Sequence, residues 1–152
     1  MDALNIAKEY DSTQYIVIKI GEEQYGIDIK YVDNILRMQS ITRVPHAQPY
    51  FKGVINLRGE VVPVMSIRVK MGLDEDVITD KSRIIILKLE NNAPIGIVVD
   101  EVKEVVSLDE RNIDEVTRSK SETTFIFGVG KVDEGLISLL DLNTVISEKE
   151  LV

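Results

Sequence analysis

The stretch from Lys52 to Met65, Lys-Gly-Val-Ile-Asn-Leu-Arg-Gly-Glu-Val-Val-Pro-Val-Met, reads as two β-strands joined by a tight turn. Both arms are rich in Val and Ile, which favour pleated structure. Between the arms lies Arg58-Gly59-Glu60, in which Gly59 is expected to supply a positive φ. Pro63 has no N–H to donate, so it is expected at a sheet edge or a bulge. The stretch therefore predicts a β-hairpin.

The pattern around this hairpin occurs twice in the chain. The matching segments are 16–20 with 85–89 (69 positions apart), 26–29 with 96–99 (70 apart), 53–54 with 128–129 (75 apart) and 63–67 with 138–142 (75 apart). Each copy reads as hairpin, short helix, loop, hairpin and short helix; in the first copy Ile29, Val32, Ile35 and Leu36 have helical spacing. A small sheet hides its edges best by closing on itself, so two small barrels side by side are expected.

The repeat also suggests how the chain divides. Residues 1–13 are expected to be a lead-in, 14–80 the first barrel subdomain, and 81–152 the second barrel subdomain with a C-terminal helix. The boundary is placed in the acidic loop from Gly72 to Asp80, which contains Asp74-Glu75-Asp76. An exchange of a strand or helix between the halves is left open.

Composition excludes several classes of protein. The 152 residues hold 26 acidic side chains against 18 Lys plus Arg, for a net charge of −8, and no cysteine. These features argue against disulfide frameworks, Cys-ligated metals and general nucleic-acid binding. The start of the chain has no signal-peptide pattern, and no apolar run is long enough to insert into a membrane. A cytoplasmic protein is expected.

No motif for catalysis, cofactor binding or metal binding is found. His46 is the single histidine, and nothing around it has the spacing of a zinc site or a catalytic triad. The Gly128-Val129-Gly130-Lys131 segment continues as a hairpin rather than into the helix that a phosphate loop needs. From Lys30 to Lys70, however, seven basic residues stand against two acids. This excess is either a solvated face or a docking surface for an acidic partner.

Taken together, several segments resemble the CheW-type chemotaxis coupling proteins. The strongest match is 51–59, Phe-Lys-Gly-Val-Ile-Asn-Leu-Arg-Gly, preceded by Arg43-Val44-Pro45 and followed by Val61-Val62-Pro63-Val64. Supporting matches lie at 25–29, 96–100, 128–129 and 139–142. The resemblance covers about 14–148, nearly the whole chain.

The resemblance implies a mainly β fold with two SH3-like, five-stranded barrel subdomains and short helices. It implies an adaptor without enzymatic activity or a cofactor, which binds the regulatory domain of the chemotaxis histidine kinase CheA and the cytoplasmic hairpin tip of chemoreceptors. Such a protein is recruited to membrane receptor arrays through protein contacts alone.

The resemblance also implies partner-binding residues in two segments. Val32 and Ile35 fit the family's V-x-E-I helix, with Asn34 where the family usually has Glu. The remaining candidates belong to the strand and turn that the family uses toward receptor and kinase: Val54, Ile55, Asn56, Leu57, Arg58 and Gly59. A second departure is Ser66, which stands where the family has Asp or Asn. Arg58 is expected to project into solvent beside apolar neighbours, a combination typical of binding hot spots.

Two other functions fit the same residues. One is a sensor module that holds a small ligand in or between its barrels. The other is a stand-alone relative of the kinase regulatory domain. A ligand pocket would need polar groups that converge on a cavity, and the sequence indicates none.

Overall fold

The computed structural model describes residues 11–90, 93–116, 125–133 and 135–146. Within them the chain is mainly β-structure, as predicted. The strands are β1 (Thr13–Ile20), β2 (Glu23–Asp28), β3 (Val32–Arg37), β4 (Phe51–Leu57), β5 (Glu60–Ser66), β6 (Arg83–Leu87), β7 (Ile95–Val99), β8 (Glu101–Leu108), β9 (Ile113–Glu115), β10 (Ile126–Val132) and β11 (Gly135–Leu140). The helices are η1 (Ile29–Tyr31), α2 (Ile67–Lys70), η2 (Glu110–Asn112) and α3 (Leu142–Val145). In these residues no helix has the length and apolar character needed to cross a membrane.

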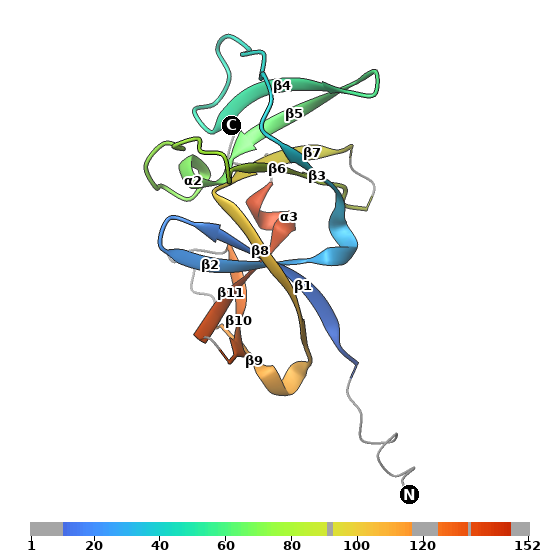
Figure 1. The fold of residues 1–152 in the computed structure, drawn as a ribbon, viewed down its shortest axis with the longest axis vertical. Coiled ribbons are helices and arrows are strands. Elements are labelled where there is room, and N and C mark those ends of the chain that lie inside the picture. The colour runs from blue at the N-terminus through green and yellow to red at the C-terminus, as the bar shows by residue number, and fades with distance from the viewer. Residues whose placement is uncertain (1–10, 91–92, 117–124, 134, 147–152) are drawn as a thin grey trace, which may run out of the picture.

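The strands form two sheets. Sheet one has the order β8-β1-β2-β11-β10-β9, and sheet two has the order β3-β6-β7-β5-β4. In Figure 1 sheet two occupies the upper half of the molecule and sheet one the lower half, with α3 between them. Each sheet curls around its own apolar cluster, because side chains from its opposite edges meet there: Leu36 and Ile55 in sheet two, Leu108 and Ile113 in sheet one. We call the two units barrel one and barrel two.

The barrels do not follow the expected division at residue 80. Barrel two is the continuous stretch from β3 to β7, whereas barrel one combines β1 and β2 with β8 to β11. The crossing arises from two parallel pairings between segments far apart in the chain, β5 with β7 and β11 with β2. The hairpin β4–β5 of the first half thus completes a sheet with β6–β7 of the second half. This is the exchange that the repeat left open.

The internal repeat is visible in the strand orders. The first five strands of sheet one, β8-β1-β2-β11-β10, correspond in order to the five strands of sheet two, β3-β6-β7-β5-β4. The burial patterns of β4 and β10 are identical residue by residue. Barrel one departs from the expected five strands, because the three residues of β9 add a sixth strand beside β10.

Three apolar clusters explain why β1 and β6 contain runs of consecutive apolar residues. Alternate residues of β6 face different clusters: Ile84 and Ile86 point into barrel two, while Ile85 and Leu87 join a central cluster between the barrels. Strand β1 is placed in the same way, between barrel one and the central cluster. A strand covered on both faces has no solvent side to require polar residues. The uninterrupted apolar runs of β1 and β6 follow from this position.

The helical turns expected between Ile29 and Leu36 are largely a strand. Only Ile29–Tyr31 is helical, a single 3-10 turn in which the Asp28 carboxylate accepts a hydrogen bond from the Lys30 amide at 3.0 Å. Val32–Arg37 is β3, and it pairs antiparallel with β6. Its half-buried and exposed residues alternate with period two, and a β-bulge follows Val32. The helical prediction holds for Ile29–Tyr31 and was wrong for Val32–Leu36, because a few apolar residues also satisfy a strand pattern.

Each repeat ends in a short helix with a side-chain cap. The Ser66 hydroxyl accepts a hydrogen bond from the Val69 amide at 3.1 Å at the start of α2. The Asp141 carboxylate accepts one from the Thr144 amide at 3.4 Å at the start of α3. Ser and Asp are both good N-cap residues. Ser66, the second departure from the family pattern, therefore keeps the capping role of its repeat partner.

An ion pair joins the two barrels at the turn between β1 and β2. Arg68 of α2 donates two hydrogen bonds to Asp100, from Nε at 3.1 Å and from an Nη at 2.6 Å. The same carboxylate accepts a hydrogen bond from the Gly21 amide at 2.8 Å. Burial raises the pKa of Asp100, but the bonds from Arg68 and Gly21 outweigh it and hold the pKa below its ordinary value. Asp100 is thus held as a carboxylate between the barrels.

Candidate partner-binding surface

The hairpin β4–β5 has a two-residue turn with an unusual backbone. Leu57 pairs with Glu60, and between them Arg58 and Gly59 both have positive φ, 53° and 85°. Positive φ at both central residues is the mark of the type I′ turn, whose twist matches that of the flanking strands. The Asn56 side-chain oxygen accepts a hydrogen bond from the Gly59 amide at 3.0 Å. The positive φ expected for Gly59 is confirmed, and that of Arg58 was not foreseen.

The candidate residues of this hairpin divide between its two faces. Ile55 is 3% exposed in the core of barrel two, and Leu57 packs against the same cluster. Asn56, Arg58 and Gly59 are exposed, and Val54 is half-buried on the Asn56 side. Ile55 was named for partner binding, but its side chain is not accessible, since this strand needs its inward residues for the core.

Sequence reasoning missed two residues of the outward face. Asn56 pairs with Val61 and Val54 pairs with Pro63, so these four side chains share one face. Val61 is 67% exposed, a large value for an apolar strand residue. Its neighbour Val62 is in the core, so strict alternation from Val62 would have placed Val61 outside. We call Val54, Asn56, Arg58, Val61 and Pro63 the hairpin face.

Pro63 was expected at a sheet edge or a bulge; it lies in an inner strand, beside the register shift that falls opposite Val64 and Met65. Strand β5 sits between β4 and β7. Its pairing with β7 covers only Val64, Met65 and Ser66, so Pro63 precedes that ladder. The missing N–H of Pro63 therefore removes no bond of the ladder with β7.

The candidate residues of β3 lie on the opposite edge of sheet two from β4. Ile35 is 39% exposed, whereas Val32 packs against the central cluster. The Asn34 side-chain oxygen accepts a hydrogen bond from the Ile35 amide at 2.8 Å. Asn34 therefore caps its own backbone rather than presenting the carboxylate that the family usually has. The two candidate segments, β3 and β4, thus belong to the same barrel, but the two strands do not pair with each other.

A backbone bridge after β3 closes barrel two onto β4. The Thr42 amide donates to the Val54 carbonyl and the Val54 amide donates to the Thr42 carbonyl, both at 2.8 Å. Gly53 makes this approach possible: a Cβ there would lie 2.1 Å from the Thr42 carbonyl oxygen, and its φ is 141°. Gly53 is therefore required by the bridge that positions the hairpin face.

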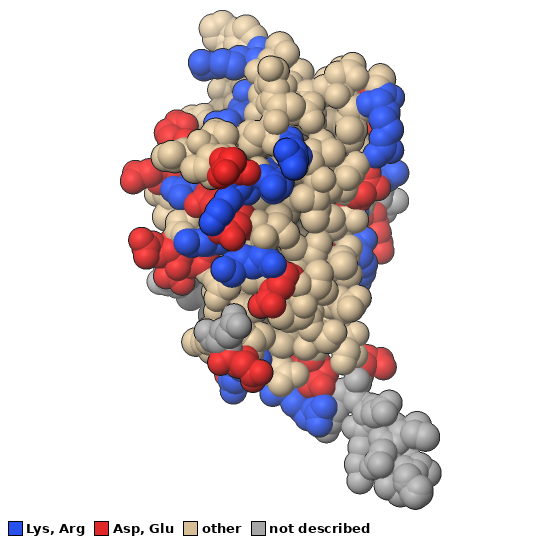
Figure 2. Space-filling view, in the orientation of Figure 1, with Lys and Arg blue, Asp and Glu red and all other residues tan. Residues whose placement is uncertain are grey.

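The basic stretch from Lys30 to Lys70 is less available than its count suggests. Arg68 is bound to Asp100, and Lys52 forms an ion pair with Asp76 at 3.4 Å. Lys70 is buried, and its ammonium lies 4.2 Å from the centre of the Tyr50 ring. Figure 2 shows basic and acidic atoms interspersed over the left flank in this view. Of the stretch, Lys30, Arg37, Arg43 and Arg58 remain as exposed cations.

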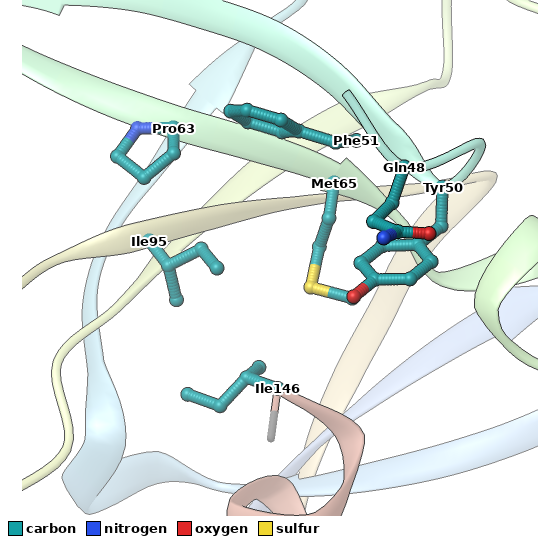
Figure 3. Close-up of a pocket in the computed structure, with 7 residues that line it drawn as sticks. All are labelled: Gln48, Tyr50, Phe51, Pro63, Met65, Ile95 and Ile146. Atoms are coloured by element: carbon teal, nitrogen blue, oxygen red, sulfur yellow. The ribbon is translucent and has the colours of Figure 1, made fainter. Parts of the chain in front are cut away.

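A small apolar pocket lies beside the hairpin (Figure 3). Its lining residues are Gln48, Tyr50, Phe51, Pro63, Met65, Ile95 and Ile146. None of them is an acid or a basic residue, and the polar side-chain groups of the lining are the Gln48 amide and the Tyr50 hydroxyl. Among the described residues, no group of three or more His, Asp or Glu is placed to hold a metal ion.

Comparison with known proteins gives a consistent result. The family model of the CheW-like domain matches residues 14–150. Chemotaxis protein CheW of Bacillus subtilis (strain 168) is 35% identical over 136 residues, which span 88% of this chain and 86% of that protein. Chemotaxis protein CheW of Klebsiella aerogenes is 31% identical, spanning 96% of this chain and 89% of that protein.

Solved structures agree with the sequence relatives. The crystal structure of scaffolding protein TtCheW from Thermoanaerobacter tengcongensis superposes with a TM-score of 0.82 at 30% identity, covering 90% of this chain and 94% of that chain. The two-barrel fold, the internal repeat and the motif at 51–59 support the same family assignment as these matches. The chain belongs to the CheW-like domain family of chemotaxis scaffold proteins.

Proposed function

We propose that this protein is a non-enzymatic adaptor that couples the cytoplasmic tips of chemoreceptors to the histidine kinase CheA, through the kinase's regulatory domain. The observation that carries the proposal is the hairpin face. An exposed Arg58 stands at its tip, next to the exposed Val61 and the half-buried Val54. An arginine beside desolvatable apolar surface is a frequent arrangement in binding hot spots.

The hairpin face and Ile35 are the residues assigned to partner binding, with Asn34 beside Ile35 on β3. Ile55, Leu57 and Gly59 support the face from within: two fill the core and one completes the turn. Because Asn34 carries no charge, contacts at β3 are expected to be apolar or hydrogen-bonded rather than ionic. The chain acts in the cytoplasm and joins receptor arrays through these protein contacts.

The proposal is tested by retention of two fragments on the immobilised full chain. The fragments are the CheA regulatory domain and a receptor hairpin tip, applied separately and together. Val61→Asp is expected to weaken retention of at least one fragment, because a carboxylate on the hairpin face must be desolvated in the complex. Val77→Asp is the matched control, since Val77 is 70% exposed and lies outside the hairpin face.

Two outcomes would count against the proposal. Retention of neither fragment by the wild-type chain would contradict the coupling role. Equal losses from Val61→Asp and Val77→Asp would contradict the hairpin face while leaving the coupling role in place. The expectation that the chain has neither catalytic activity nor a tightly bound metal has its own test: a stoichiometric metal that survives chelation at a site including His46 would overturn it.

A further inference from the structure

The loop between β3 and β4 encloses a hollow of about 330 Å³ lined by nine residues of one segment, 43–52. The lining residues are Arg43, Val44, Pro45, His46, Ala47, Gln48, Pro49, Phe51 and Lys52. Four of them, Arg43, His46, Gln48 and Lys52, carry side-chain nitrogen groups that can donate hydrogen bonds, and none carries a carboxylate. The hollow therefore has an electropositive lining in a protein whose net charge is −8.

The loop is held in shape before any ligand arrives. The Thr42–Val54 bridge anchors its start, and the Phe51 amide donates to the Gln48 carbonyl at 2.9 Å near its end. Pro45 and Pro49 each fix one φ angle. His46 between them has a φ of 61°, a conformation that non-glycine residues seldom adopt outside well-determined surroundings. A hollow with a fixed shape loses little entropy on binding.

The pairing of the hollow's charges leaves Arg43 as its exposed cation, with the exposed His46 side chain in the same lining. Lys52 is paired with Asp76, whose side chain is only 1% exposed, so this pair lies at the base of the loop. Arg43 and His46 are exposed. In the part of the chain that the structure describes, neither has a carboxylate within ion-pair distance.

The lining favours a carboxylate on a peptide over a phosphate group. Phosphate sites in proteins are built mainly from converging backbone N–H groups. This loop has two fewer backbone N–H donors, because Pro45 and Pro49 carry no N–H. Its walls include apolar Val44 and Phe51, which suit the methylene groups of an acidic side chain. Phe51 also begins β4, the strand that carries Val54 and Asn56 of the hairpin face.

We propose that this hollow receives a glutamate or aspartate side chain from an acidic segment of the protein's partner, with Arg43 as the main ligand of the carboxylate and His46 as a second donor. The inference rests on the proposed function only in that the segment belongs to the adaptor's partner. The hollow itself has a test that needs no partner.

The test is a titration of the full chain with hexaglutamate, followed through backbone amide chemical shifts. Saturable shifts are expected at residues 43–52, and none of that kind is expected with hexaglutamine or with inorganic phosphate at equal ionic strength. Arg43→Gln is expected to raise the Kd for hexaglutamate about fivefold, the effect of losing one well-placed exposed ion pair. His46→Asn, which keeps a residue tolerant of positive φ, is expected to raise it less.

Arg37→Gln is the matched control. Arg37 is exposed on β3 and does not line the hollow, so its loss changes the net charge by the same amount. Equal Kd values for Arg37→Gln and Arg43→Gln would overturn the proposal, because general electrostatics would then explain the binding. Phosphate binding as tight as that of hexaglutamate, or shifts centred outside 43–52, would also overturn it. These outcomes are independent of the fragment retention that tests the adaptor role.

Discussion

At position 58 the backbone conformation favours a residue other than arginine, whereas the proposed binding role needs the arginine side chain. A substitution there is therefore expected to change stability and partner binding in opposite directions. The φ of 53° suits Asn or Gly better than Arg, while the exposed guanidinium serves the hairpin face. Arg58→Asn is expected to raise the free energy of unfolding by about 0.5–1 kcal/mol, because Asn-Gly is a favoured type I′ pair. The same substitution is expected to weaken partner binding by roughly 1–3 kcal/mol, the range of a moderate hot spot.

Denaturant unfolding and partner titration of Arg58→Asn and Arg58→Ala measure both effects. Alanine lacks the tolerance of Asn for this φ, so Arg58→Ala is expected to lose affinity without the gain in stability. A variant that unfolds more easily while binding partners as tightly as the wild type would mean that Arg58 has a structural role instead.

Gly53 and Gly59 both have positive φ but differ in their surroundings. A Cβ at position 53 would collide with the Thr42 carbonyl, while one at position 59 meets nothing within 4 Å. Gly59→Ala is expected to cost about 1–2 kcal/mol from backbone strain alone. Gly53→Ala is expected to cost on the order of 3 kcal/mol or more, since the Thr42–Val54 bridge must break. Thermal unfolding of the two variants gives the comparison, and equal losses would show that the bridge contributes nothing.

Single residues of the candidate site were predictable where local chemistry decided them. Gly59 followed from turn preferences, and the exposure of Arg58 followed from the cost of burying a guanidinium. The burial of Ile55 and the exposure of Val61 depended on which face of the hairpin meets the core. The hairpin faces the core through Val62, which packs against Ile84 of β6 inside barrel two. This contact is non-local, so the sequence of the hairpin alone does not reveal it.

Among the elements, α2 and the β1–β2 turn are linked through the pair Arg68–Asp100, whose side chains are only 16% and 21% exposed. Asp100→Asn is expected to lower the free energy of unfolding at pH 7 by roughly 2 kcal/mol, as for hydrogen bonds to a charged group. The folded pKa of Asp100 is depressed, so its contribution is present above the ordinary aspartate pKa of about 4 and is lost as pH falls through the folded value.

The wild type is therefore expected to lose stability more steeply than Asp100→Asn as the pH falls below about 4. Urea unfolding at a series of pH values measures this slope for both proteins. Asp114→Asn is the control, because Asp114 pairs with Lys131 across largely exposed side chains. Parallel pH profiles for wild type and Asp100→Asn would contradict the assigned role of the pair.

Most strands could be identified from the sequence, because the apolar runs and turn residues are local signals. The segment 32–37 could not, since Val32, Ile35 and Leu36 fit both helical and strand spacing over so few residues. Its state is decided by the partner strand β6, which offers a full antiparallel ladder about fifty residues later in the chain.

At the scale of the whole molecule, we expect the central cluster to make the two barrels unfold as one cooperative unit. Ile97 lies in this cluster, together with residues of β1, β2 and α3 from barrel one. Ile97→Ala is expected to cost about 2–5 kcal/mol, because the site is fully buried and cannot collapse freely. Hydrogen exchange is expected to show reduced protection in both barrels to the same extent. A loss of protection confined to barrel two would mean that the barrels unfold separately.

The two-barrel architecture was predictable from the repeat, but the membership of each barrel was not. The offsets identify equivalent segments without saying which copy each hairpin joins. That assignment is made by the pairings β5 with β7 and β11 with β2, both parallel and both non-local. Parallel strands are not joined by a tight turn, so no turn motif in the sequence indicates which strands pair.

The continuous course of barrel two, from Val32 to Val99, has a consequence for how the chain emerges from the ribosome. The hairpin β1–β2 is translated first, yet its barrel partners β8 to β11 begin only at Glu101. At roughly 5–20 residues per second, the hairpin waits several seconds for them. All residues of barrel two precede Glu101 in the chain, and its Ile85, Leu87 and Ile97 belong to the central cluster. We therefore expect barrel two to fold before barrel one, and the waiting hairpin to find its apolar contacts on the barrel-two side of the central cluster.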